Sequence, residues 1–265
     1  MRGKRGKILV AALIGGMLII APPARAADAP VQLKPSPPIG DAVPAFPRIV
    51  AASDDKAAAR IDNALAKLDA LTRQAMKECR ANVQNENDFD FERTITVTMR
   101  GPRYLSFSVG GSQDCGGAHP DAGDSVFVYD LTTGSPVNWQ RLLPKSIVQG
   151  TSLDTDINGA TIAFVTSKTL QALWLKAEAA AANPIDPDCK DAVTDPKLQL
   201  SLYPDAKAGG LAVQPGDFPH VIAACADTIV IPTATLRPLG VDAALLDAID
   251  AAHAGGFFDK GLPEN

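Results

Sequence analysis

Hydrophobic residues recur at helical spacing in three stretches of the chain. After the polar residues 53–55, which can cap a helix, apolar side chains follow at intervals of three or four; they are Ile61, Ala64, Leu65, Leu68, Leu71, Ala75, Met76 and Cys79. Residues 159–182 and 241–254 carry two further stripes, which end at Asn183-Pro184 and Gly255-Gly256. The pattern predicts one long helix and two later helices.

Alternating polar and apolar residues predict strands between these helices. Residues 92–99 and 104–109 alternate on either side of the turn Arg100-Gly101-Pro102-Arg103, which indicates an antiparallel hairpin. Further strands are expected at 125–131, 137–139, 198–202, 210–213 and 228–231, with a glycine-rich loop at 110–124. Helices that flank a mostly antiparallel sheet define an α+β fold.

The N-terminal residues have the layout of a secretory signal peptide. MRGKRGK is basic, the run from Ile8 to Ala21 is apolar, and Ala24-Arg25-Ala26 forms a cleavage site. The run is shorter than the roughly 20 apolar residues that a membrane-spanning helix needs. We therefore expect residues 1–26 to be removed, no transmembrane anchor after cleavage, and a periplasmic or secreted protein.

Prolines dominate the next segment, residues 27–52. They are Pro30, Pro35, Pro37, Pro38, Pro44 and Pro47. This density excludes a helix and favours extended chain, so the segment is expected to be a linker or an edge segment. The folded body is expected to be a single domain from 53 to 265.

The net charge of the chain becomes more negative when the predicted signal peptide is left out. The chain holds 25 Lys and Arg against 30 Asp and Glu, a net charge of −5. Residues 1–26 contain five bases and no acid, so their removal takes the net charge from −5 to −10. An acidic chain disfavours nucleic acid and anionic lipid and favours a cationic partner.

Four cysteines follow the signal peptide: Cys79, Cys115, Cys189 and Cys225. An even count in an exported protein predicts two disulfides with three alternative pairings. The sequential pairing is preferred because each bridge then closes a moderate loop within one half of the chain. A zinc site would need C-x-x-C or paired histidines at ligand spacing, and the sequence has neither.

Two short motifs match known functional patterns incompletely. Gly110-Gly111-Ser112 lacks the final glycine of the G-x-S-x-G elbow of serine hydrolases. Residues 154–159 read Asp-Thr-Asp-Ile-Asn-Gly, the first half of a calcium loop, but Val165 stands where a bidentate acid should be. We expect residues 154–159 to form a polar turn and cap ahead of the helix predicted from 159.

The most unusual stretch is Asp114-Cys115-Gly116-Gly117-Ala118-His119-Pro120-Asp121. Its glycines allow a tight turn, and its histidine and acids could contact a ligand; the alternative is a structural turn held by histidine hydrogen bonds to backbone. A metal is the weaker option, because no second histidine is near in sequence. The candidate partner-binding residues are Asp114, Gly116, Gly117, His119, Pro120, Asp121 and Asp124, with no metal or cofactor expected.

Several segments together resemble the RsiV-type domain family: YLSFSVGGSQDCGGAHP, VFVYDLTTG, NWQRLLP and FPHVIAACADTIVIPTATLRPLG. The resemblance spans about 91–240, and its specific part is G-G-A-H-P at Gly116–Pro120 with D-L-x-T-G at Asp130–Gly134. The family comprises exported domains of lysozyme-sensing anti-sigma factors and of proteins close to peptidoglycan deacetylases. It implies an α+β domain without catalytic residues and, in its characterised branch, the cationic protein lysozyme as partner.

The leading interpretation is a non-enzymatic periplasmic or secreted domain that binds a cell-envelope partner, either a cationic protein such as lysozyme or peptidoglycan. One alternative is a small envelope hydrolase that uses His119 and neighbouring acids. Another is a structural envelope protein tethered through residues 27–52. The chain departs from the sensor branch in its cleavable signal and its added cysteines.

Overall fold

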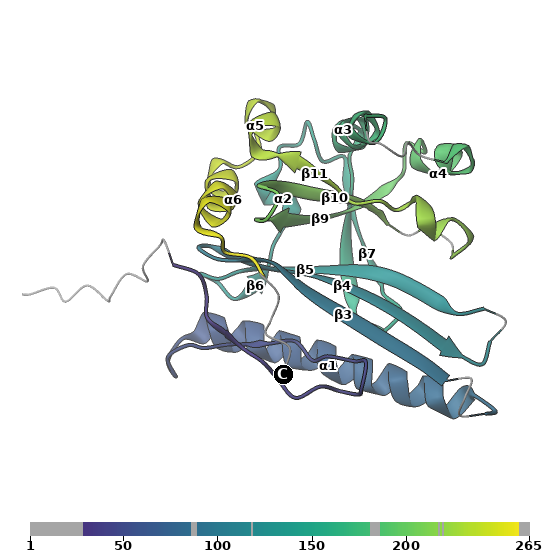
Figure 1. Ribbon diagram of the computed structural model, residues 1–265. Helices are drawn as coiled ribbons and strands as arrows, with labels where there is room; N and C mark the ends of the chain where they lie inside the picture. Colours follow the sequence, from purple (N-terminus) through teal and green to yellow (C-terminus); the bar gives the residue numbers. More distant parts are fainter. Residues whose placement is uncertain are drawn as a thin grey trace, which may run out of the picture.

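The chain folds into layers (Figure 1). The computed structural model describes residues 29–85, 89–117, 119–180, 186–216, 218 and 220–259, so the predicted signal peptide lies outside the described residues. Helix α1 (Lys56–Asn82) covers one face of a four-stranded antiparallel sheet, and a five-stranded antiparallel sheet packs on the opposite face. Shorter helices cover the second sheet, so the predicted α+β class is confirmed.

Helix α1 forms where the helical stripe predicts it. The Asp55 side chain accepts a hydrogen bond from the Ala58 N–H at 2.9 Å and caps the first turn. Ile61 and Leu65 are fully buried and share a core cluster with Phe107 of the underlying sheet. The apolar stripe is thus the face that α1 buries.

The four-stranded sheet has the order β3-β4-β5-β6. Its strands are β3 (Phe89–Arg100), β4 (Tyr104–Cys115), β5 (Asp121–Asp130) and β6 (Ser135–Pro136). The hairpin of β3 and β4 is confirmed, but the glycine-rich loop expected at 110–124 is wrong, because β4 and β5 extend through most of it. The strand expected at 137–139 is also wrong: Asn138 caps the short helix α2 (Trp139–Leu142) by accepting from the Gln140 N–H.

The five-stranded sheet has the order β11-β10-β9-β8-β7. Its strands are β7 (Gly150–Thr155), β8 (Thr161–Thr166), β9 (Gln199–Asp205), β10 (Gly210–Gly216) and β11 (Ile229–Pro232). The helix predicted for 159–182 is corrected, because its first part is β8 and only α3 (Lys168–Glu178) is helical. The β-branched run 161–166 favours a strand, and Ser167 caps α3 by accepting from the Leu170 N–H.

Helix α6 (Ala243–Gly255) closes the fold as predicted, with Asp242 accepting from the Leu245 N–H. The shorter elements are β1 (Leu33–Lys34), β2 (Arg48–Ile49), α4 (Lys190–Val193), α5 (Thr233–Leu236), η2 (Pro187–Cys189), η3 (His220–Cys225) and η4 (Arg237–Leu239). One cluster of core residues, around Trp174 and Leu200, lies between the two sheets and under the helices that cover the five-stranded sheet. A second lies between α1 and the four-stranded sheet, and a small third cluster contains Val43, Cys79 and Phe91.

Residues 29–52, the described part of the proline-rich segment, pack on the folded body, so of the two roles expected for the segment they fit the edge segment and not the linker. Phe46 is fully buried and packs edge-to-face on Phe107, with ring centroids 5.1 Å apart. The extended backbone bonds to the sheet: the Val31 N–H donates to the Arg100 carbonyl. The prolines keep the backbone of the segment extended, and burial of its apolar side chains holds it against the domain.

A fully buried carboxylate, Asp69, joins this segment to α1 and β3. Its Oδ1 accepts from the Phe46 backbone N–H and from Arg93 Nη1, each at 3.1 Å, and its Oδ2 accepts from Arg48 Nη2 at 2.6 Å. The Arg93 guanidinium also lies 4.4 Å from the Phe46 ring centroid. Burial lowers the pKa of Arg93, and the Asp69 carboxylate opposes that shift.

Two disulfides tie the ends of elements together. Cys79 in α1 is bonded to Cys115 in β4, and Cys189 in η2 is bonded to Cys225 in η3. This is the sequential pairing preferred from loop length. None of the helices in the described ranges could span a membrane.

Replacing Asp69 with Asn should lower the free energy of unfolding by about 3–5 kcal/mol, because Arg93 would stay buried without its counter-ion. Denaturant unfolding followed by circular dichroism measures the change. Asp247→Asn is the control: it removes an acid that is 67% exposed and paired with Arg237, so it should change stability far less. Equal losses in the two variants would contradict this account.

The tyrosines should ionise at abnormally high pH in the folded protein. Burial raises the pKa of Tyr104 and of Tyr129 to about 12 and raises the pKa of Tyr203. These are all the tyrosines of the chain. For Tyr104 and Tyr129, the stability that depends on the neutral hydroxyl group is complete below the unfolded pKa of about 10 and is lost as the pH rises through about 12. Ultraviolet titration should show normal ionisation only in denaturant; a native transition near pH 10 would refute the burial.

Candidate functional site

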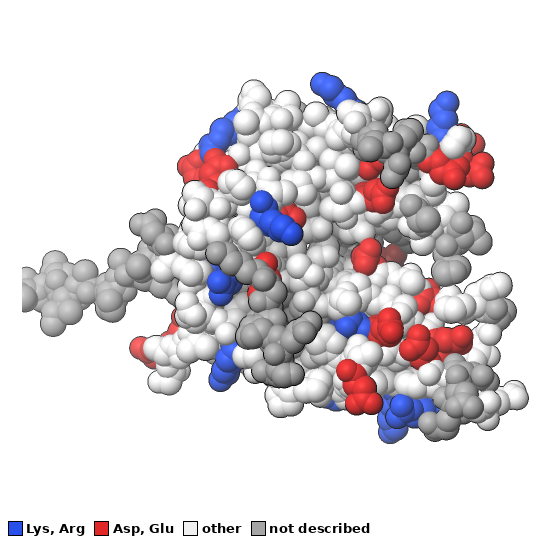
Figure 2. Space-filling view, viewed as in Figure 1, with Lys and Arg blue, Asp and Glu red and all other residues white. Residues whose placement is uncertain are grey.

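An acidic cleft of about 240 Å³ opens between the two sheets, with β5, the β7–β8 hairpin, β10 and η3 around it. All of its charged lining residues within the described part of the chain are acids: Asp121, Asp124, Asp154 and Asp156. In Figure 2, most of the visible Asp and Glu lie in the right half of the view, where the ends of β4 and β5 lie, whereas Lys and Arg are scattered over both halves. The cleft therefore belongs to an acidic part of the molecule.

Glycines in the four-stranded sheet let the tip of the β7–β8 hairpin pack against it. A Cβ atom at Gly111 would lie 3.3 Å from Ile157 Cδ1, and one at Gly123 would lie 3.6 Å from Ile157 Cγ2. A Cβ at Gly123 would make ordinary contact with Ile157, and one at Gly111 would require the end of that side chain to shift by a few tenths of an ångström. This contact explains why glycines typical of a loop lie instead within paired strands.

Asp156 is committed to holding the hairpin in place. Its Oδ1 accepts from the N–H groups of Asn158 (2.9 Å) and Ala160 (2.8 Å), and its Oδ2 accepts from Ser125 Oγ (2.9 Å) in β5. The calcium-like stretch 154–159 thus forms the last two residues of β7 and the turn that leads to β8. The expected cap ahead of a helix is corrected, because the turn leads into a strand.

The other three acids of the cleft keep oxygens available. Asp124 Oδ2 accepts from Gln214 Nε2 of β10 at 2.9 Å, a bond that links the two sheets. Asp154 Oδ1 accepts only from the N–H of its neighbour Thr155. The Asp121 side chain is exposed and has no hydrogen bond or ion pair to another described residue. Free carboxylate oxygens accept hydrogen bonds from ammonium or guanidinium groups.

Only some of the residues predicted to bind a partner line the cleft. Asp121 and Asp124 line the cleft, whereas Gly117, His119 and Pro120 are exposed and do not line it. His119 has no hydrogen bond to the rest of the described chain, so the backbone-holding turn expected for it is not seen. Sequence analysis missed Gln214 altogether, because no local pattern connects it with an acid 90 residues away.

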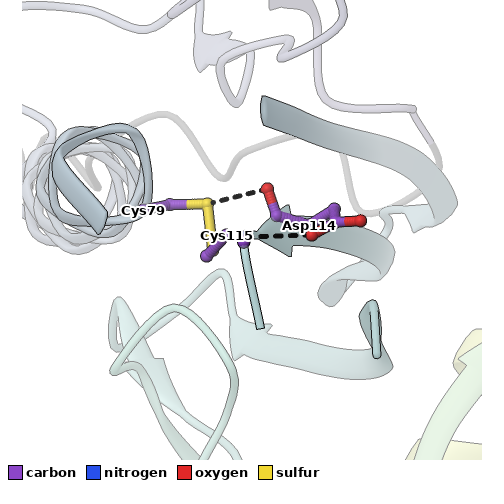
Figure 3. Close-up of a disulfide and its surroundings, with 4 residues drawn as sticks. Cys79, Asp114 and Cys115 are labelled. Atoms are coloured by element: carbon purple, nitrogen blue, oxygen red, sulfur yellow. Dashed lines mark hydrogen bonds between the residues drawn. A yellow bond between two sulfur atoms is a disulfide. The ribbon is translucent and has the colours of Figure 1, made fainter. Parts of the chain in front are cut away.

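Asp114 and Gly116 have structural roles beside the Cys79–Cys115 disulfide (Figure 3). Asp114 Oδ1 accepts from the Gly116 N–H at 3.0 Å, and the Cys79 sulfur lies 3.4 Å from the Asp114 carbonyl oxygen. Gly116 has φ +75°, and a Cβ there would lie 3.2 Å from Val83 Cα. Glycine is therefore required where β4 passes the end of α1.

The D-L-x-T-G motif is also structural. Asp130 Oδ1 accepts from the N–H groups of Thr132 (2.7 Å) and Thr133 (3.3 Å), which shapes the turn after β5. Partial burial favours a higher pKa for Asp130, but the hydrogen bonds from Thr132 and Arg103 outweigh it and lower the pKa. Gly134 has φ +71°, and a Cβ there would overlap the Ala57 carbonyl. The motif thus lets the turn pass close to the start of α1.

The titratable side chains that line the cleft, among the described residues, are all carboxylates. The lining residues include no histidine or cysteine, and the Ser125 hydroxyl donates to Asp156. No set of three or more His, Cys, Asp or Glu side chains, among those described, could hold a metal ion. What the arrangement offers chemically is a set of hydrogen-bond acceptors with negative charge.

No protein-family model matches the sequence, and no curated protein matches it. Among solved structures, it is similar to the crystal structure of a member of the DUF3298 family from Bacteroides fragilis. The TM-score is 0.46 at 13% identity, over 83% of this chain and 95% of that chain. This is a distant structural neighbour, and the RsiV-type resemblance stays a prediction from the sequence.

Replacing Asp156 with Ala should lower the free energy of unfolding by about 1–3 kcal/mol, because two backbone N–H groups and the Ser125 hydroxyl lose their acceptor. Asp121→Ala is the matched control and should leave stability nearly unchanged, since that side chain has no partner among the described residues. Thermal unfolding compares the two variants. If Asp121→Ala were destabilised and Asp156→Ala were not, the structural role assigned to Asp156 would be contradicted.

Proposed function

We propose that this protein is a binding domain of the cell envelope that recognises a cationic protein through the acidic cleft. The observation that carries the proposal is the lining itself, in which the charged groups of the described residues are all carboxylates and three keep free oxygens. Such a surface raises the local concentration of cations and orients a cationic partner as it approaches. Removal of the predicted signal peptide would leave a net charge of −10, which favours the same class of partner.

Lysozyme is the specific partner that we propose, as a strongly cationic protein that acts in the envelope. The sequence resemblance to RsiV-type domains supports this choice. A periplasmic or secreted location is part of the proposal, and the two disulfides fit an oxidising compartment.

A protein partner is favoured over a peptidoglycan strand. Glycan recognition commonly uses exposed aromatic rings, but both tryptophans of the chain are buried, Trp139 at 6% and Trp174 at 0% exposure. The three tyrosines are at most 6% exposed. The alternative of a hydrolase centred on His119 gains no support, because His119 is exposed and lies outside the cleft.

Calorimetric titration of residues 27–265 with lysozyme tests the proposal, since that span holds every described residue. Binding should be saturable at low salt and weaker at moderate salt. The double variant Asp121→Asn with Asp154→Asn should bind about tenfold more weakly, because each exposed charge pair contributes up to about 1 kcal/mol.

The control is Asp54→Asn with Asp191→Asn, which makes the same change in net charge at two exposed acids that do not line the cleft. It should bind lysozyme nearly as well as the unmodified protein. Equal losses in the two double variants would contradict the cleft as the site. Absence of binding at low salt would exclude lysozyme, and peptidoglycan fragments would then be titrated in its place.

A further inference from the structure

The size of the acidic cleft limits what can enter it. Pockets for drug-sized ligands measure about 300–1,000 Å³, whereas this cleft measures about 240 Å³. We propose that the cleft receives one arginine or lysine side chain that projects from the partner protein. This inference rests on the proposed function and specifies the group that is recognised.

The apolar lining of the cleft matches the stem of such a side chain. Ile162, Phe164 and Phe218 line it together with the small residues Ala223 and Ala226. Phe164 is 4% exposed, and a Cβ at Gly216 would overlap its ring, so this glycine leaves the space that the ring occupies. Arginine and lysine carry three or four methylene groups that pack on apolar surface while the charged head stays among polar groups.

The carboxylates of the lining match the charged head. Asp124 is held by Gln214, so it does not need to be ordered when a ligand binds. Asp121 and Asp154 offer further free oxygens. A guanidinium or ammonium group can therefore make charge-assisted hydrogen bonds to more than one acid.

The same lining discriminates against other small ligands. Phosphate and carboxylate groups would be repelled by the acids, and no described set of side chains could hold a metal ion. A free amino acid would bring its own α-carboxylate to the cleft, whereas a residue within a protein chain would not. The chemistry thus selects a cationic side chain that belongs to a polypeptide.

Peptide titrations followed by NMR test the charge and shape of the ligand. The probe is a blocked pentapeptide with arginine between pairs of glycines, and the control replaces arginine with citrulline, which has nearly the same shape without the charge. The arginine peptide should shift amide resonances around the cleft in a saturable way, and the citrulline peptide should bind at least about tenfold more weakly. Equal binding of the two peptides would overturn the inference.

Filling the cleft tests whether a side chain enters it. Ala223→Leu and, independently, Ala226→Leu reduce the space without changing any charge. Each should weaken binding of the arginine peptide and of lysozyme by at least about tenfold. Ala59→Leu on the exposed face of α1 is the control and should have no effect. Thermal unfolding identifies a variant that fails to fold. In that case the binding measured with the other filled variant decides whether a side chain enters the cleft.

The outcomes separate this inference from the proposed function. If lysozyme binds both filled variants with full affinity but binds the cleft-acid variant weakly, the inference is overturned and the proposed function stands. If the arginine peptide binds and the filled variants abolish this binding, the inference is supported even where lysozyme itself does not bind. If no arginine peptide shifts the cleft resonances, the inference is overturned.

Discussion

The packing of α1, the N-terminal segment and the four-stranded sheet depends on one buried group, the Asp69 carboxylate. It accepts hydrogen bonds from Phe46, Arg48 and Arg93, so a single side chain of α1 holds the N-terminal segment and the edge of the four-stranded sheet. Burying a charge is costly, and the cost is offset only when every partner is present at once. These contacts are all made when the three parts pack as they do in this fold. This requirement makes the segment before α1 part of the domain.

The opposite face of the same sheet creates the cleft. Gly111 and Gly123 leave the space that Ile157 occupies, and Asp156 fixes the hairpin tip to Ser125. The two sheets meet there, and the hydrogen bond from Gln214 to Asp124 closes one side of the junction. The cleft is thus a consequence of how the sheets pack, and the residues that shape it are mostly distinct from those that can bind a ligand.

This separation of roles gives the acidic cleft its chemical character. Asp156 uses its oxygens to stabilise a turn, while Asp121 and Asp154 have oxygens directed to no described partner. Carboxylates that serve no structural purpose raise the negative potential of a surface and repel one another, so they reduce stability unless a cation approaches. A cationic partner relieves this repulsion, which connects the electrostatics of the fold with the function that we propose.

Local patterns determined much of this protein. The stripe of α1, the β3–β4 hairpin, the α+β class and the preferred disulfide pairing all follow from spacing along the chain. Tertiary structure decided the rest: residues 161–166 fit helical spacing but pair as a strand, and the proline-rich segment is buried through Phe46. It also separated His119 from Asp124 and brought Gln214 to that acid across 90 residues. Periodicity reports only which neighbours along the chain share a face, whereas the cleft is made by residues that become neighbours only when the two sheets pack.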